Sequence, residues 1–105
     1  MNNLKFGFSP THPGEVLKDE IEYRGISQSR LAEQMGMPYK ALNQILNEHR
    51  PVTVATAMMF EAALGIPAYS LINIQTDYNI QVASRNTGFM EKLKKISMAA
   101  ASVAI

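Results

Sequence analysis

The segment at residues 39–50 carries the side chains whose types and spacing best fit a chemical task. Helical spacing places most of its polar residues on one face. A lysine there can donate to O6 and N7 of guanine, and asparagine or glutamine can pair with N6 and N7 of adenine. The face has no acidic residue before Glu48, unlike an ordinary solvated helix face. These polar residues are Tyr39, Lys40, Asn43, Gln44 and Asn47. The chemistry they could do is reading base edges in the major groove of DNA.

Three further side chains flank this face. Gln28 lies at the expected start of the preceding helix, where its side chain and the nearby backbone N–H groups can hold a phosphate. His49 and Arg50 follow the expected reading helix and suit the neighbouring phosphate backbone. The sequence therefore predicts base contacts framed by phosphate contacts.

Two short helices joined by a tight turn must position these residues. Ala32 supplies the small side chain that two steeply crossing helices need, and Gly36 can adopt positive φ where the chain reverses. Leu42 and Ile45 would pack the second helix back on the first and leave its opposite face exposed. This skeleton is typical of a helix-turn-helix unit, whose second helix enters the major groove. The skeleton alone also fits an ordinary helical hairpin inside a bundle.

The rest of the chain predicts an all-α fold of five short helices. Pro13 suits a first helical turn, Ser27 and Thr53 suit N-caps, and Pro38 and Pro67 can open the third and fifth helices. No stretch shows sustained strand alternation. We expect an N-terminal arm at residues 1–12, the helical domain at 13–83, and a tail at 84–105 that is helical or flexible.

Composition limits the class of protein. The 105 residues suffice for one core, and 47% hydrophobic with 18% charged residues excludes wholesale disorder. Without cysteine there is no disulfide, thiolate nucleophile or cysteine zinc site. No other side chains form a catalytic or metal-binding set, and His12 is expected to make a local hydrogen bond at the first helix start. We therefore expect a soluble cytoplasmic protein that is not an enzyme and needs no cofactor.

The formal net charge of +1 is low for a protein that binds DNA. The charge is unevenly distributed, however. Residues 13–24 hold two basic and four acidic side chains, whereas residues 26–50 hold three basic and two acidic ones. This pattern favours a specific binder that depends on dimerisation over a general nucleic-acid coat.

Several motifs together resemble the HigA family of antitoxins, short members of the XRE, or phage-repressor-like, helix-turn-helix superfamily. The His-Pro-Gly-Glu sequence at residues 12–15 discriminates best, and the similarity covers roughly residues 9–83. The motifs are the segments at residues 11–17, 25–28, 42–47, 63–65 and 73–75, together with Ala57.

This resemblance implies a five-helix repressor-like domain in a bacterial toxin–antitoxin module. Family members dimerise, bind operator DNA ahead of their own operon, and neutralise a cognate HigB-type toxin that cleaves mRNA. No membrane partner is expected. Carried over to this sequence, the base-reading positions of the family are Tyr39, Lys40 and Gln44. The phosphate positions are Gln28, Asn47, His49 and Arg50, and Asn43 falls between the two classes. A stand-alone regulator without a toxin, or a protein-interaction domain that does not bind DNA, remains the alternative.

Four positions depart from the family pattern. Pro38 stands where serine or threonine is frequent, and Glu48 stands where glycine is common. Ser70-Leu71 replaces the usual aromatic pair of the fifth helix. Glu61 replaces a small residue, and we expect it to face the inner side of the fourth helix in a structural role.

The amphipathic stretch at residues 89–96 has three interpretations. It could be a frayed helix or disordered tail, a helix that binds a second copy or the toxin, or a helix that lies on a membrane surface. Its apolar stripe of Phe89, Leu93 and Ile96, with lysines on the opposite side, fits each of them.

Overall fold

The computed structural model describes residues 9–103, so most of the expected N-terminal arm lies outside the described residues. Over this range the chain is helical and contains no strand. The prediction of five helices falls one short, because the expected tail forms a sixth, fully developed helix. The helices are α1 (Pro13–Arg24), α2 (Gln28–Met35), α3 (Tyr39–Leu46), α4 (Val54–Leu64), α5 (Ala68–Ser84) and α6 (Thr87–Val103).

Local capping explains where the helices begin. The Ser27 hydroxyl accepts a hydrogen bond from Arg30 N at 3.3 Å, at the start of α2. Thr53 and Thr56 form a reciprocal capping box at the start of α4. Pro38 occupies the N-cap position of α3, where no side chain caps the helix. These starts confirm the predicted ones, because capping depends on neighbours close in sequence.

One core holds α1 to α4 and the start of α5 together. Phe60 of α4 is fully buried, and so is Leu71 of α5, at the position where the aromatic pair was missing. Burying a side chain of this size contributes about 1.5–3 kcal/mol. The core consists of Leu17, Ile21, Leu31, Ala32, Met35, Leu42, Ile45, Leu46, Val52, Ala57, Phe60, Leu64 and Leu71.

The start of α1 is fixed by a buried clamp. His12 Nδ1 accepts a hydrogen bond from Gly14 N at 2.8 Å, which confirms the expected local bond of this histidine. The imidazole also packs edge-on against the ring of Tyr78 in α5, with 4.8 Å between centroids. A Cβ on Gly14 would lie 2.0 Å from the carbonyl oxygen of Ile45, so only glycine allows α1 to approach the end of α3 this closely. Burial lowers the pKa of His12 below its ordinary value of 6.5, while the Glu48 carboxylate acts to raise it.

The expectation that Glu61 faces the inner side of α4 was wrong, although the residue does have a structural role. Its side chain is exposed, and one carboxylate oxygen accepts a hydrogen bond from Ala68 N at 3.0 Å, at the first residue of α5. The inner side of α4 is formed instead by Ala57, Phe60 and Leu64. α4 is apolar almost all round, so periodicity alone does not identify its buried side. A carboxylate at a helix start is favourable, and Glu61 thus fixes the turn between α4 and α5.

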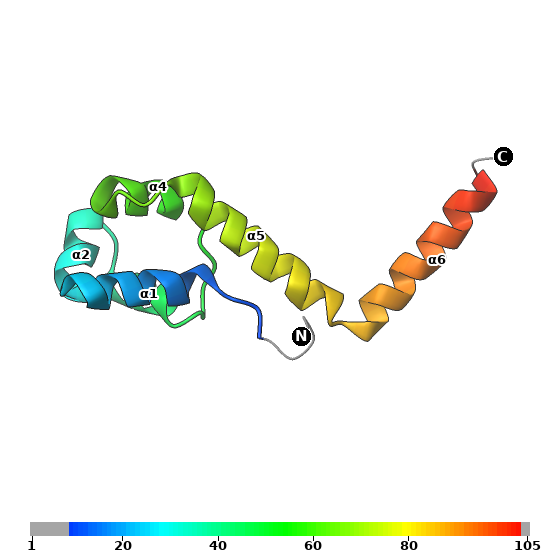
Figure 1. Cartoon of the computed structure of the whole chain (residues 1–105), viewed down its shortest axis with the longest axis horizontal. Coiled ribbons are helices and arrows are strands. Elements are labelled where there is room, and N and C mark those ends of the chain that lie inside the picture. The colour runs from blue at the N-terminus through cyan, green and yellow to red at the C-terminus, as the bar shows by residue number, and fades with distance from the viewer. Residues whose placement is uncertain (1–8, 104–105) are drawn as a thin grey trace.

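The two C-terminal helices give the molecule an elongated shape of 58 × 28 × 22 Å. Figure 1 shows α1 to α4 gathered at one end, α5 leading away from them, and α6 turning off at the far end of α5. No residue of α6 whose side chain the structure describes is buried. None of the described helices is both long and apolar enough to cross a membrane.

Candidate nucleic-acid interface

The helix-turn-helix unit is formed by α2, α3 and the turn between them. Gly36 ends α2 with a φ of 67°, and Met37 N donates to the carbonyl of Ala32 at 3.0 Å, which closes the turn. Leu42 and Ile45 are fully buried and hold α3 against the rest of the core. The opposite face of α3 therefore points to solvent. Tyr39, with half of its area exposed, and the exposed Lys40 begin this face.

A side-chain hydrogen bond joins the end of this face to the loop that follows α3. Arg50 Nη2 donates to Gln44 Oε1 at 2.7 Å. The Gln44 amide is thereby oriented by Arg50, a residue that the sequence predicts to contact a phosphate of DNA. His49, between them in the loop, is exposed, and its backbone N–H donates to the Gln44 carbonyl at 2.8 Å. The structure thus brings together a predicted base-reading residue and two predicted phosphate residues.

A second hydrogen bond connects α3 to the start of α2. Asn43 Nδ2 donates to Gln28 Oε1 at 3.2 Å, and both side chains are half-buried. Asn43 therefore supports Gln28 from within the unit. Holding Gln28 in one orientation reduces the entropy lost when a ligand binds it.

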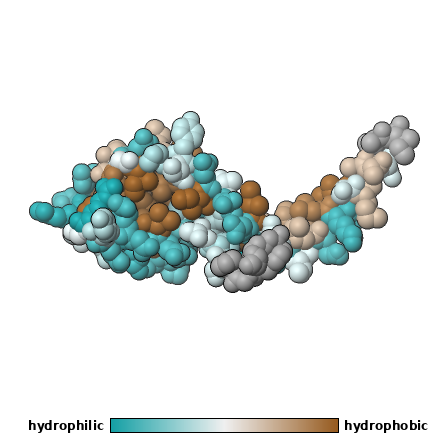
Figure 2. All heavy atoms as spheres, viewed as in Figure 1, coloured by the Kyte–Doolittle hydropathy of each residue, from teal (hydrophilic) through white to brown (hydrophobic). Residues whose placement is uncertain are grey.

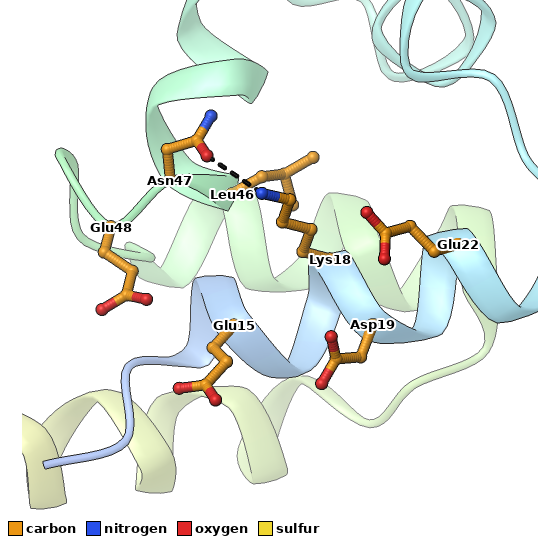
Figure 3. A pocket seen from close by; sticks show the side chains of 7 residues that line it. All are labelled: Glu15, Lys18, Asp19, Glu22, Leu46, Asn47 and Glu48. Atoms are coloured by element: carbon orange, nitrogen blue, oxygen red, sulfur yellow. Dashed lines mark hydrogen bonds between the residues drawn. The ribbon is translucent and has the colours of Figure 1, made fainter. Parts of the chain in front are cut away.

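Asn47 is held by two elements at once, and one of its partners was missed by the sequence analysis. Its Nδ2 donates to the carbonyl of Asn43 at 2.9 Å, and its Oδ1 accepts from Lys18 Nζ of α1 at 3.2 Å. Figure 3 shows this contact at the edge of a hollow between α1 and the end of α3. Lys18 and Asn47 are 29 residues apart, so no local signal could have joined them.

The hollow beside Lys18 is strongly acidic. Four carboxylates line it, from Glu15, Asp19 and Glu22 of α1 and from Glu48. Carboxylates repel a polyphosphate at short range. The acidic side of α1 and the exposed face of α3 are thus electrostatically distinct.

Glu48 has an unusual backbone conformation. Its φ is 67°, in the left-handed region, and no other non-glycine residue of the described chain has a positive φ. The Glu48 N–H donates to the Ile45 carbonyl at 3.1 Å, as the chain leaves α3. A side chain costs about 1–2 kcal/mol in this conformation, which explains why glycine is common at this position in similar sequences.

Within residues 9–103, no group of three or more His, Asp or Glu side chains is placed to hold a metal ion.

Comparison with known proteins decides the family. A family model described as "Helix-turn-helix", HTH_3, matches residues 17–71, from α1 into α5. The chain belongs to this XRE-type helix-turn-helix family. A similar protein, "Virulence-associated protein I" of Dichelobacter nodosus, is 33% identical over 76 residues, which are 71% of this chain and 70% of that protein.

Two of the solved structures that are similar to this helix-turn-helix protein are an antidote protein and an antitoxin. An addiction module antidote protein of the HigA family from Coxiella burnetii is 30% identical, with a TM-score of 0.74, over 84% of this chain and 95% of that one. The Pseudomonas aeruginosa antitoxin HigA, solved with the higBA promoter, is 27% identical, with a TM-score of 0.66, over 83% and 90%. The resemblance inferred from the motifs is thereby confirmed, and the family is one of DNA-binding regulators.

Proposed function

We propose that this protein is a sequence-specific DNA-binding antitoxin that represses its own operon and neutralises a cognate HigB-type, mRNA-cleaving toxin in the cytoplasm. The observation that carries the DNA-binding part is the exposed face of α3, on which the Gln44 amide is held by Arg50 at 2.7 Å. The similar HigA of Pseudomonas aeruginosa was solved with promoter DNA, and the Coxiella burnetii relative is described as an antidote protein.

In this proposal Tyr39, Lys40 and Gln44 read base edges in the major groove. Gln28, Asn47, His49 and Arg50 contact phosphates and set the register, while Asn43 positions Gln28. Direct readout needs side chains held in fixed orientations, and the hydrogen bond from Arg50 provides this for Gln44, while the bond from Asn43 orients the phosphate-contacting Gln28. A homodimer would place two copies of α3 about 34 Å apart, on two half-sites of a palindrome.

The acidic side of α1 supports the same orientation on DNA. In this orientation Glu15, Asp19 and Glu22 are turned away from the duplex, whereas Glu48, which lines the same hollow as Asn47, stays near the phosphate contacts. Each protomer still offers few basic contacts, so the affinity rests on base readout and on two linked half-sites.

The test is a gel shift on the DNA upstream of the protein's own gene, with and without the product of the neighbouring gene. We expect a shift that competitor DNA of random sequence does not remove, and a complex of the protein with the neighbouring product. If the protein captures the product and shifts no DNA, α3 serves protein interaction instead. If it shifts DNA and captures no product, it is a stand-alone regulator.

Two variants separate base from phosphate contacts in this assay. Lys40→Ala should cost about 1–3 kcal/mol on the operator and relax the preference at one base position. An equal loss on every sequence would show that Lys40 contacts phosphate.

Arg50→Ala should lower the salt dependence by roughly one unit on specific and random DNA alike, and it should cost more affinity on the operator, because the Gln44 amide loses the donor that orients it. Arg50→Lys keeps the charge and should keep the salt dependence. The matched control is Lys94→Ala, which removes a positive charge from exposed α6, far along the chain from α3. A salt dependence unaltered by Arg50→Ala would contradict the phosphate role.

A further inference from the structure

α6 is a complete helix whose apolar side chains are left uncovered. The exposed fractions are 43% for Phe89, 39% for Leu93 and 54% for Ile96. Its main packing neighbour among the described helices is the end of α5. Figure 1 shows it standing apart from the body of the molecule, and Figure 2 shows brown, apolar surface along it. Most of the stability of a helix in a protein comes from packing of its apolar face, so this 17-residue helix would gain from an apolar partner.

The apolar residues of α6 follow the spacing of a helix that packs along another helix. Phe89, Leu93, Ile96 and Ala100 are separated by four, three and four residues. Intervals of four and three keep one narrow stripe facing a partner helix at a shallow crossing angle. The lysines at positions 92, 94 and 95 are exposed beside or opposite this stripe.

Size and charge change along α6 in a way that favours one orientation of the partner. The first half holds the bulky Phe89, Met90 and Leu93, whereas residues 99–101 are all alanine. The charged residues of α6 all lie at positions 91–95, and residues 96–102 carry none. In an antiparallel pair, each bulky, basic half would lie against the small, uncharged half of the other helix. A parallel pair would instead place the lysines at positions 92, 94 and 95 of the two copies at the same level, where like charges repel.

We propose that α6 is a dimerisation helix that pairs with α6 of a second copy in antiparallel orientation, with the two Ile96 side chains near the twofold axis. Leu93 of each copy then packs against the Ala100 region of its partner. The pairing is isologous and closes at two copies, as a regulator of a palindromic site requires. It names the surface of the homodimer in the proposed function and rests on that part of it.

The sequence of α6 favours a second copy over other partners. The two halves of α6 differ in size and charge so that one half can pack against the other half of a second copy. Binding to an unrelated protein or to the toxin would not require this. A helix that lies on anionic lipid carries basic residues along its polar face, and the second half of α6 has none. A single helix pair about 25 Å long is a small interface, so we expect association at micromolar concentration.

Disulfide trapping tests the pairing directly, because the full chain has no native cysteine. Ile96→Cys alone should form a cross-linked dimer under mild oxidation. A mixture of Leu93→Cys and Ala100→Cys chains should form mixed dimers. Phe89→Cys alone should not, because antiparallel pairing separates the two sites by about 22 Å and a disulfide needs Cα atoms within about 7 Å. Lys94→Cys is the matched control on the side away from the stripe.

A second measurement uses the oligomeric state of the uncross-linked chain. Leu93→Glu should shift the chain from dimer to monomer in sedimentation at micromolar concentration, and any loss of helix content should be no larger than that of α6. Lys94→Glu should leave the dimer intact. Efficient cross-linking of Phe89→Cys would overturn the antiparallel arrangement in favour of a parallel one.

Failure of this inference is distinguishable from failure of the proposed function. If no α6 cysteine cross-links and Leu93→Glu changes nothing while upstream DNA is still shifted, the pairing is wrong and the function stands. Sedimentation of the wild-type chain with vesicles of phosphatidylethanolamine and phosphatidylglycerol, lost in Leu93→Glu, would in that case assign α6 to a membrane surface. If the cross-links form and no DNA is shifted, the pairing stands and the function fails.

Discussion

Replacing Glu48 by glycine, asparagine and glutamine separates the backbone strain at this residue from its charge. Glu48 has a φ of 67°, and its carboxylate lies beside residues assigned to the phosphate backbone. Glycine removes both the strain and the charge. Asparagine removes the charge and tolerates the left-handed region, whereas glutamine removes only the charge.

The stability effect follows from two opposing magnitudes. The left-handed conformation costs a side chain about 1–2 kcal/mol, and glycine gives back about 0.5–1 kcal/mol through the entropy of the unfolded chain. Glu48→Gly should therefore stabilise the fold by up to about 1 kcal/mol, equivalent to about 4–8 °C in melting temperature. Glu48→Asn should give a smaller gain, and Glu48→Gln should give none.

The effect on DNA binding should rank the variants differently. A unit charge about 8 Å from a phosphate costs roughly 0.5 kcal/mol in water, or about twofold in affinity. All three neutral variants should therefore bind the upstream DNA about twofold more tightly per protomer at low salt, and the difference should shrink as salt is added.

The assays are thermal or urea unfolding and gel shifts over a salt series. If Glu48→Gln raises the melting temperature as much as Glu48→Gly does, charge and not backbone strain explains the effect. If glycine stabilises and no neutral variant tightens DNA binding, Glu48 lies away from the duplex. The second result would refute the orientation of the loop on DNA.

Two further predictions concern the clamp at the start of α1. Gly14→Ala should lower the free energy of unfolding in urea by more than about 2 kcal/mol despite the helix propensity of alanine, because its Cβ would lie 2.0 Å from the Ile45 carbonyl. Gly88→Ala is the control, because its Cβ would meet only Asn86 Oδ1, at 3.5 Å, and it should raise the free energy of unfolding by up to about 1 kcal/mol. Equal effects of the two substitutions would contradict the close approach of α1 to Ile45. The pKa of His12 in the folded chain lies below 6.5, so as the pH falls this histidine is protonated first in the unfolded chain. The stabilisation present above pH 6.5 should therefore be lost as the pH drops through the pKa of the folded state, by at most about 1.4 kcal/mol per pH unit. His12→Asn keeps a capping side chain without a charge, so unfolding free energies at pH 5–7.5 should show a shallower slope, and an unchanged slope would exclude His12 as its source.

The limits of sequence reasoning are clearest at Glu61, Lys18 and α6. Glu61 was misplaced because α4 is apolar on several sides, so its periodicity did not single out the face that packs. Lys18 was missed because its partner lies on another helix, 29 residues away. α6 was left undecided between helix and flexible tail, since its apolar stripe would suit a buried, a paired or a membrane-bound helix alike.

The sequence by itself determined where α1 to α5 begin, the helix-turn-helix unit and the exposed face of α3. These depend on capping, on positive φ at Gly36, and on apolar spacing around Leu42 and Ile45, all of which act over a few residues. The tertiary structure decided how that face is held, through the Arg50–Gln44 and Gln28–Asn43 hydrogen bonds. It also explains the glycine of the His-Pro-Gly motif at residues 12–14, because a residue without a side chain is required at Gly14 only when α1 lies against the Ile45 carbonyl. Such contacts depend on how helices cross, and crossing geometry is settled by the packing of the whole core.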